Sequence, residues 1–194
     1  MHISGSLVLM ADYSWKDNDK IRKGDIILGA DLISATVTET NIGYTTNMRI
    51  MSFLETPIIR FTEFSCVWAK DISHQWWWVE NATRLQHAWR SRGNKEIGLK
   101  IIDSFLVDYE VEFATLNGFE KKTIIDASED YEKNTIIPFF STDRFCPVII
   151  NGYVVAQGRI NEYVYDYTKF NWLDSYNQLI QSDKLELIKR NLLK

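Results

Sequence analysis

Apolar and polar residues alternate along much of the first third of the chain, with the period of strands that bury one face. Short apolar runs at Leu7–Met10 and Ile26–Leu28 are each bounded by polar or glycine-containing segments. Alternation resumes at Ala35 and stops at Asn41–Gly43, which predicts a hairpin turn before Tyr44. The pattern therefore predicts an N-terminal antiparallel β region.

The pattern changes to a helical period in the centre of the chain. The segment 73–93 can be capped by Asp71 or Ser73 and closed by Gly93, and four apolar residues recur in it at helical spacing. A second helix is expected from Asn94 to Asn117. Because the break between them is so short, the two helices are predicted to form an αα-hairpin.

The last third of the chain returns to β and then ends in helix. Asn151-Gly152 between two apolar runs predicts a β-hairpin with a two-residue turn. Trp172 begins a helical pattern, and Asp183–Glu186 resembles a capping box that starts one more helix. No internal repeat is visible. We expect one α+β domain over residues 1–194: an N-terminal antiparallel β region, a central αα-hairpin, a C-terminal β-hairpin and a terminal helix.

Composition narrows the functional classes only slightly. The 194 residues are 45% hydrophobic and 25% charged, and the net charge of −4 indicates no general attraction to nucleic acid. Two cysteines without metal-like spacing are expected to be reduced, and neither a membrane helix nor a secretory signal is apparent. We therefore expect a cytoplasmic, intracellular protein. An isoleucine-rich, alanine-poor composition hints at a viral or mobile-element source.

The motifs of the common enzyme classes are missing from the sequence. It contains no phosphate-binding loop, no nucleophile elbow, no His-Glu-x-x-His or Cys-x-x-Cys pair and no dinucleotide-binding fingerprint. Accordingly no metal and no cofactor is expected, and whether the chain is an enzyme stays open.

One segment combines aromatic and basic side chains in an unusual density. Four of the seven tryptophans lie within residues 73–93, three of them consecutive, and three adjacent indoles cannot all face one side of a helix or strand. Aromatic and arginine side chains contribute most to binding energy at interfaces. The candidate partner-binding residues are Trp76, Trp77, Arg84, His87, Arg90 and Arg92.

Two functional hypotheses use this surface. The first is a non-enzymatic binding protein of the inhibitor, immunity or virion-component type, with another protein as its partner. The alternative is a protein that acts on nucleic acid or nucleotides, with Arg84, Arg90 and Arg92 on phosphate, His87 as acid or base, and an indole stacking on bases. Neither hypothesis involves a membrane, and the oligomeric state is left open.

Three weaker candidates complete the sequence analysis. Asp108 and Glu112 share a face if their segment is helical, and could hold Mg²⁺ in a metal hydrolase. The acidic loop expected at 126–134 could contact a basic partner. Cys146 follows Arg144 closely and could act as a nucleophile if His74 or His87 supplied the base. For each of them a structural or solvated role is the simpler interpretation.

Overall fold

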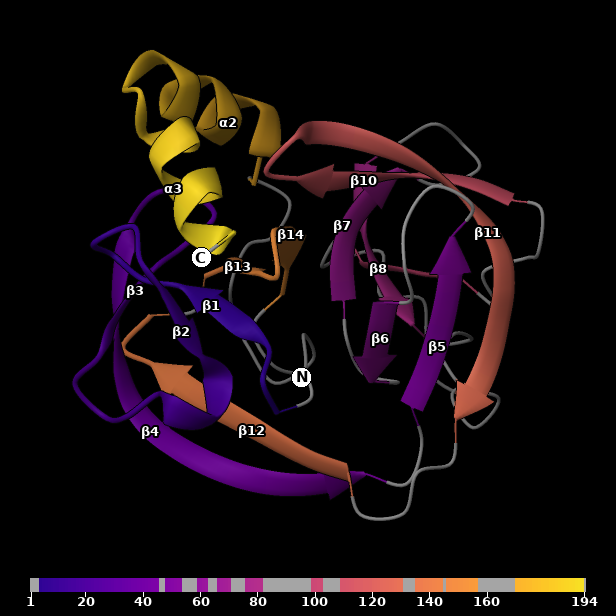
Figure 1. Ribbon diagram of the computed structural model, residues 1–194, viewed down its shortest axis with the longest axis horizontal. Coiled ribbons are helices and arrows are strands. Elements are labelled where there is room, and N and C mark those ends of the chain that lie inside the picture. The colour runs from indigo at the N-terminus through magenta and orange to yellow at the C-terminus, as the bar shows by residue number, and fades with distance from the viewer. Residues whose placement is uncertain are drawn as a thin grey trace.

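The computed structural model describes residues 4–45, 48–53, 59–62, 66–70, 76–81, 99–102, 109–130, 135–144, 146–156 and 170–193. Most of this part of the chain is β-strand, and two short helices follow at its end (Figure 1). The strands are β1 Leu7–Leu9, β2 Trp15–Asp17, β3 Ile26–Leu28, β4 Ser34–Thr45, β5 Met48–Phe53, β6 Ile59–Thr62, β7 Cys66–Lys70, β8 Trp76–Asn81, β9 Leu99–Ile102, β10 Tyr109–Thr115, β11 Gly118–Asp130, β12 Thr135–Thr142, β13 Val148–Ile150 and β14 Tyr153–Val155. The helices are a 3-10 turn η1 Asn18–Lys20, α2 Trp172–Gln181 and α3 Lys184–Leu192.

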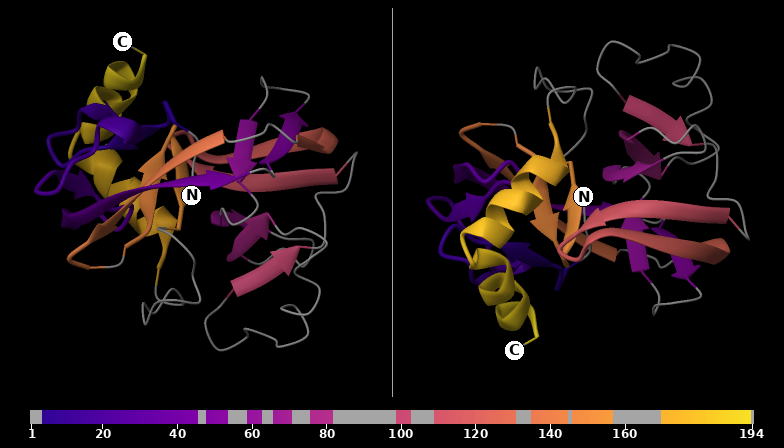
Figure 2. Two further views of the ribbon diagram at one scale, coloured as in Figure 1. Left: turned by 90° about the horizontal axis from the view of Figure 1, so that it is seen from below. Right: turned by 90° about the horizontal axis from the view of Figure 1, so that it is seen from above.

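The strands form two sheets. The larger has the order β2-β1-β13-β14-β7-β10-β11-β5-β6, with β8 added beside β7 and β9 beside β8, and the smaller has the order β12-β4-β3. Every pairing among the described strands is antiparallel except β8 with β9. In both views of Figure 2, β5 to β11 project to one side, and the helices lie with β1 to β4 on the other.

The main hydrophobic core lies between the two helices and the strands around β13. Trp172 is fully buried, and its indole N–H donates to the carbonyl oxygens of Thr115 (3.1 Å) and Gly118 (3.3 Å). A buried indole needs such an acceptor, so the first residue of α2 is attached to the β10–β11 turn. Ile149 and Val154, from β13 and β14, and Ile188, from α3, are also fully buried in this core.

The predicted αα-hairpin is wrong, because residues 76–81 and 99–102 are strands β8 and β9, and 109–115 is strand β10. The last of these also shows period-two alternation, with Tyr109, Val111 and Phe113 separated by glutamates, and β-branched and aromatic residues favour a strand that can pair on both sides. Gly118, expected just beyond a helix end, has a φ of +91° and belongs to the tight turn between β10 and β11. The fold class is therefore mostly β rather than the α+β arrangement expected.

Three smaller expectations are also corrected. Asn41–Gly43 is not a turn, because β4 continues through it while paired with β12. In the acidic loop expected at 126–134, residues 126–130 instead belong to β11, paired with β5, and residues 131–134 lie outside the described part of the chain. Asp183 forms no capping box, since its φ of 57° places it in the left-handed region and its side chain makes no cap hydrogen bond.

Other local predictions are confirmed. The hairpin at Asn151-Gly152 joins β13 to β14, and both turn residues have positive φ, 51° and 83°, as a type I′ turn requires. The terminal segment is helical from Trp172. Asn171 caps it by accepting the backbone N–H of Leu173 at 3.1 Å.

Candidate functional site

The candidate site lies around residues 4–7, where the chain enters strand β1 of the larger sheet. Strand β1 pairs with β13 at Val8 and Ile150. Next to this pair, the backbone N–H of Leu7 donates to Oδ1 of Asn151 at 2.7 Å, and the backbone N–H of Asn151 donates to the carbonyl of Leu7 at 2.9 Å. The turn residue Asn151 thus binds both backbone groups of Leu7, its N–H and its carbonyl.

The last strand of the sheet lies on the other side of β13. Strand β14 is antiparallel to β13, and β1 is antiparallel to β13 as well, so β1 and β14 run in the same direction. Neighbouring strands are spaced by about 4.8 Å, which places β1 and β14 roughly 10 Å apart. The first and the last strand of the β fold are therefore held close together by a single strand between them.

Residues 4–6, which we call the leading segment, pass between β12 and η1. The backbone N–H of Ser4 donates to the carbonyl of Ile136 at 3.2 Å, and the Ser4 hydroxyl donates to Oδ2 of Asp19 at 3.2 Å. Ser6 is buried, and its carbonyl accepts the backbone N–H of Asn18 at 2.8 Å. The leading segment therefore carries one exposed hydroxyl in contact with a carboxylate and one buried hydroxyl.

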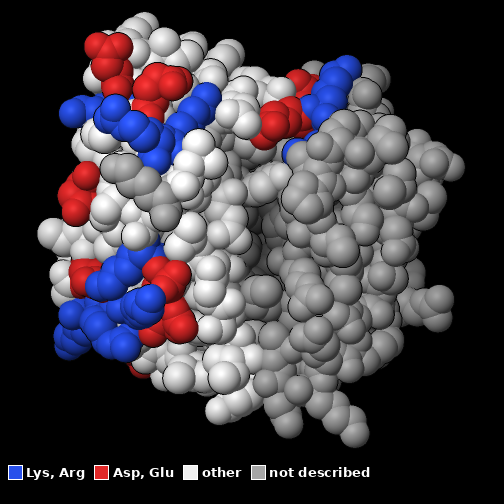
Figure 3. All heavy atoms as spheres, in the orientation of Figure 1, with Lys and Arg blue, Asp and Glu red and all other residues white. Residues whose placement is uncertain are grey.

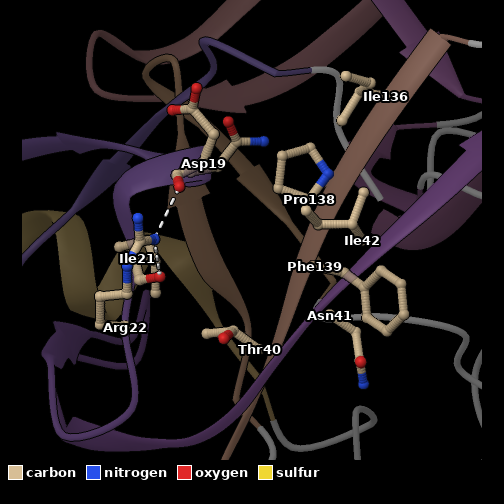
Figure 4. Close-up of a pocket in the computed structure, with 10 residues that line it drawn as sticks. Asp19, Ile21, Arg22, Thr40, Asn41, Ile42, Ile136, Pro138 and Phe139 are labelled. Atoms are coloured by element: carbon tan, nitrogen blue, oxygen red, sulfur yellow. Dashed lines mark hydrogen bonds between the residues drawn. The ribbon is translucent and has the colours of Figure 1, made fainter.

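A cavity of about 470 Å³ is lined in part by Asp19 and Ile136, the two residues that bind Ser4 (Figure 4). Ile42, Ile136 and Pro138 form an apolar wall from the β4–β12 ribbon, and Asp19 and Arg22 face them from η1 and the turn after it. The Arg22 guanidinium donates to the backbone carbonyls of Asp19 and Ile21, both at 2.8 Å, as the dashed lines show. The cavity thus has both apolar and polar lining, with polar side chains from η1 on one side and from β4, at Thr40 and Asn41, on the other.

The basic-aromatic surface expected from the sequence is not assembled by the described residues. Trp76 and Trp77 lie on strand β8 instead of a helix, opposite Lys70 and Ala69 of β7. Arg84, His87, Arg90 and Arg92 lie outside the described residues, so the role proposed for them stays a prediction.

The helix expected to carry the carboxylates of Asp108 and Glu112 is contradicted at Glu112. Asp108 lies outside the described residues, and Glu112 lies on strand β10 opposite Lys121 of β11. Among the residues that the structure describes, no three histidine, cysteine or acidic side chains are grouped in a way that could hold a metal ion.

Cys146 is poorly suited to act as a nucleophile. Its side chain is fully buried, and burial raises the pKa of the thiol to about 12, so that the unreactive protonated form predominates at neutral pH. The guanidinium of Arg144 acts weakly in the opposite direction and is already bound to Asp31 through two hydrogen bonds of 2.9 and 2.7 Å. His74 and His87, the bases considered for this cysteine, lie outside the described residues.

Sequence reasoning missed the residues that do meet at the site. Ser4 and Asp19 are separated by 15 positions, and Leu7 and Asn151 by 144. The Asn-Gly turn was visible in the sequence, but nothing local indicates that its amide oxygen binds the first strand.

The chain is similar to solved structures but to no known sequence family. No family model matches it, and no curated protein sequence matches it either. A bacterial intein-like domain from Clostridium thermocellum superposes with a TM-score of 0.50 at 15% identity, over 80% of this chain and 96% of that one. A DnaB intein from Synechocystis sp. PCC 6803 gives 0.49 at 14% identity, over 80% and 97%.

The likeness to the Clostridium thermocellum domain overturns the functional hypotheses drawn from the sequence. Inteins are self-splicing, protein-processing domains, and so are neither non-enzymatic binding proteins nor proteins that use a basic cluster on nucleic acid. Nothing in that comparison supports a viral source. No described helix is long and apolar enough to cross a membrane. At this level of identity the likeness concerns architecture, and the chain has an intein-like fold.

Proposed function

We propose that this protein is an intein-like processing domain, which acts on the polypeptide joined to it rather than on a separate substrate. The fold it shares with the Clostridium thermocellum intein-like domain supports this proposal. The observation that carries it is the position of β1 and β14 on the two sides of β13.

That arrangement suits chemistry at peptide bonds of the same chain. A domain that rearranges its flanking polypeptide must hold the junction in a fixed position within the fold. Holding reactants in place makes the step intramolecular, which can lower a barrier by about 7–11 kcal/mol. Here the bond between the Asn151 side chain and Leu7 fastens the first strand beside the turn that begins the last one.

The reacting group we assign is the hydroxyl of Ser4. Asp19 accepts its hydrogen bond and would take its proton, because a serine hydroxyl is a weak nucleophile until a base activates it. Attack of the Ser4 oxygen on the carbonyl carbon of the preceding residue forms an ester. The peptide bond between the carbonyl carbon of Ile3 and the nitrogen of Ser4 breaks in the same rearrangement, and the proton passes to the released amino group of Ser4. A hydroxyl or amine nucleophile can then cleave that ester.

The test uses the full chain placed between two folded reporter proteins. Expected products are species shortened at the reporter in front of Ser4, identified by intact-protein mass spectrometry over time. Hydroxylamine, a nucleophile that cleaves esters, should increase the yield of the released reporter. Ser4→Ala should abolish this product and Asp19→Asn should slow its formation.

Ser14→Ala is the matched control, because Ser14 also donates a hydroxyl hydrogen bond to an aspartate, Oδ1 of Asp12 at 2.5 Å, but lies in another turn. This variant should process normally. A fusion that stays intact under all conditions would contradict the proposed function, whereas processing unchanged in Ser4→Ala would contradict only the assignment of the nucleophile. A cytoplasmic location stays a prediction from the sequence.

A further inference from the structure

The long ribbon of β4 and β12 has two outer edges, and they differ in how far they are protected. On the β12 edge, the carbonyl of Ile136 accepts the backbone N–H of Ser4 at 3.2 Å. Two residues further along, Pro138 has no N–H to offer. Proline and an added segment are common ways to prevent a sheet edge from pairing with another chain. The outer edge of β12 is therefore protected from pairing with another strand.

On the opposite edge, the outward backbone groups of β4 have hydrogen-bond partners only in the first part of the strand. Thr36 pairs with Ile26 of β3, and Val37 exchanges backbone hydrogen bonds with Gly24 and Asp25, each of 2.8 Å. Beyond Val37, β4 continues to Thr45 as the outermost strand of the ribbon (Figure 1). No backbone group among the described residues binds this part of its outer edge.

The register shows which residues direct their backbone groups outward. Pro138 lies opposite Ile42, and Ile136 lies opposite Tyr44. In an antiparallel ladder, hydrogen-bonded pairs alternate with pairs whose N–H and C=O groups point away from each other. Since Pro138 has no N–H and the Ile136 carbonyl binds Ser4, both pairs are of the outward type. Thr40, Ile42 and Tyr44 thus present their donors and acceptors on the outer edge of β4.

Two large apolar side chains of this edge are exposed. Ile42 is 66% and Tyr44 is 70% exposed. Between residues 38 and 45 the single charged residue is Glu39, and there is neither lysine nor proline. In Figure 3 the described atoms between the charged cluster at lower left and the grey atoms are mostly white. An exposed edge with a single charged residue, no lysine and no proline favours pairing.

We propose that a second copy of this chain pairs with β4 edge to edge, antiparallel, about a two-fold axis at Ile42. In that register, Ile42 lies beside Ile42 of the second copy, and Thr40 lies beside Tyr44 of the second copy. Glu39 lies opposite Thr45 of the second copy, so no like charges face each other. The strand is therefore complementary to itself, as a two-fold interface requires, and this favours a second copy over an unrelated peptide.

The contact is short, and this determines its strength. One strand edge buries less surface than the roughly 1,200–2,000 Å² typical of stable complexes. The dimer is therefore reversible and forms in proportion to concentration.

The test is sedimentation equilibrium of the full chain over a wide range of protein concentration. The weight-average mass should rise from that of one chain toward that of two. Ile42→Pro should weaken dimerisation at least tenfold, because it removes an outward N–H while the ladder to β12 needs no N–H at this position. Tyr44→Lys is a second variant that keeps the backbone donor and adds a charge to the edge.

Ile136→Lys is the matched control, because it places the same charge across from Tyr44 but on the protected strand, and it should dimerise like the original protein. Circular dichroism checks that each variant is folded. A one-chain mass at every concentration would overturn the proposal. So would dimerisation that is unchanged in the folded variants Ile42→Pro and Tyr44→Lys.

Discussion

The chain forms the same five-residue turn twice, at Met10–Ser14 and at Gly29–Ile33. In each, the first residue donates its N–H to the carbonyl of the fifth, at 2.9 and 3.0 Å, and accepts the N–H of the fourth, at 3.0 and 2.9 Å. Both turns have Ala-Asp in the middle. The fourth residue has a positive φ in each case, 66° at Tyr13 and 62° at Leu32. The repeat was not recognised in the sequence, because the strands around it differ.

The two turns differ in what holds them to the rest of the protein. The first is covered by α3: Trp15 donates its indole N–H to the carbonyl of Ile188 at 3.0 Å, and Asn191 donates its side-chain amide to the carbonyl of Tyr13 at 3.0 Å. The second is held by Arg144, which binds Asp31 through both carboxylate oxygens and also the carbonyl of Ile33 at 2.7 Å. The same local geometry is thus attached once by hydrogen bonds to helix α3 and once by a charged side chain.

The largest expected loss of stability comes from disturbing helix α3, to which the first turn is attached. Ile188 is fully buried, so Ile188→Ala should lower the free energy of unfolding by about 2–5 kcal/mol, measured by urea denaturation. Hydrogen exchange should accelerate more at the amides of Met10 and Tyr13 than at those of Gly29 and Leu32. Leu193→Ala, at a residue that is 89% exposed, should have little effect. Equal acceleration in both turns would show that they are not held separately.

A smaller loss of stability is expected when the ion pair between Arg144 and Asp31 is removed. Arg144 and Asp31 are partly buried, with side chains 28% and 16% exposed, so Arg144→Ala should cost about 1–3 kcal/mol in urea denaturation. Arg144→Lys should recover only part of this, because an ammonium group cannot bind both carboxylate oxygens in the planar manner of a guanidinium. Arg190→Ala, on the exposed part of α3, serves as the control. Full rescue by lysine would show that charge alone is sufficient.

The smallest expected effect is a change in the pKa of Asp12, a residue of the first turn. Hydrogen bonds from the Ser14 hydroxyl and backbone N–H lower the pKa of Asp12. Because this pKa is lower in the folded state, the stabilisation is present above the unfolded pKa and is lost as the pH falls through the folded one. Ser14→Ala should raise the Asp12 pKa toward 3.8, followed by NMR of its carboxyl carbon. Ile33→Ala, the equivalent change in the second turn, should leave it unaltered; a shift there would mean that the turns are coupled.

Local chemistry explains which parts of the fold could be predicted. The Asn151-Gly152 hairpin and the Asn171-capped helix depend on turn and capping residues that act on their immediate neighbours. The central segment depends instead on strand pairing. Its apolar residues fit a helical and a β period alike, and strand β10 is stabilised by β7 and β11, which no local pattern specifies.

The amino-acid sequence by itself determined the Asn151-Gly152 turn, the terminal helix from Trp172 and the first short strands, because these follow from interactions within a few residues. Only the tertiary structure decided that the centre is β, that Cys146 is buried, and that Ser4 meets Asp19 while Leu7 meets Asn151. Contacts between distant residues form when whole strands and helices pack together. They arise from the combined burial of many side chains, which a single sequence does not display in any one segment.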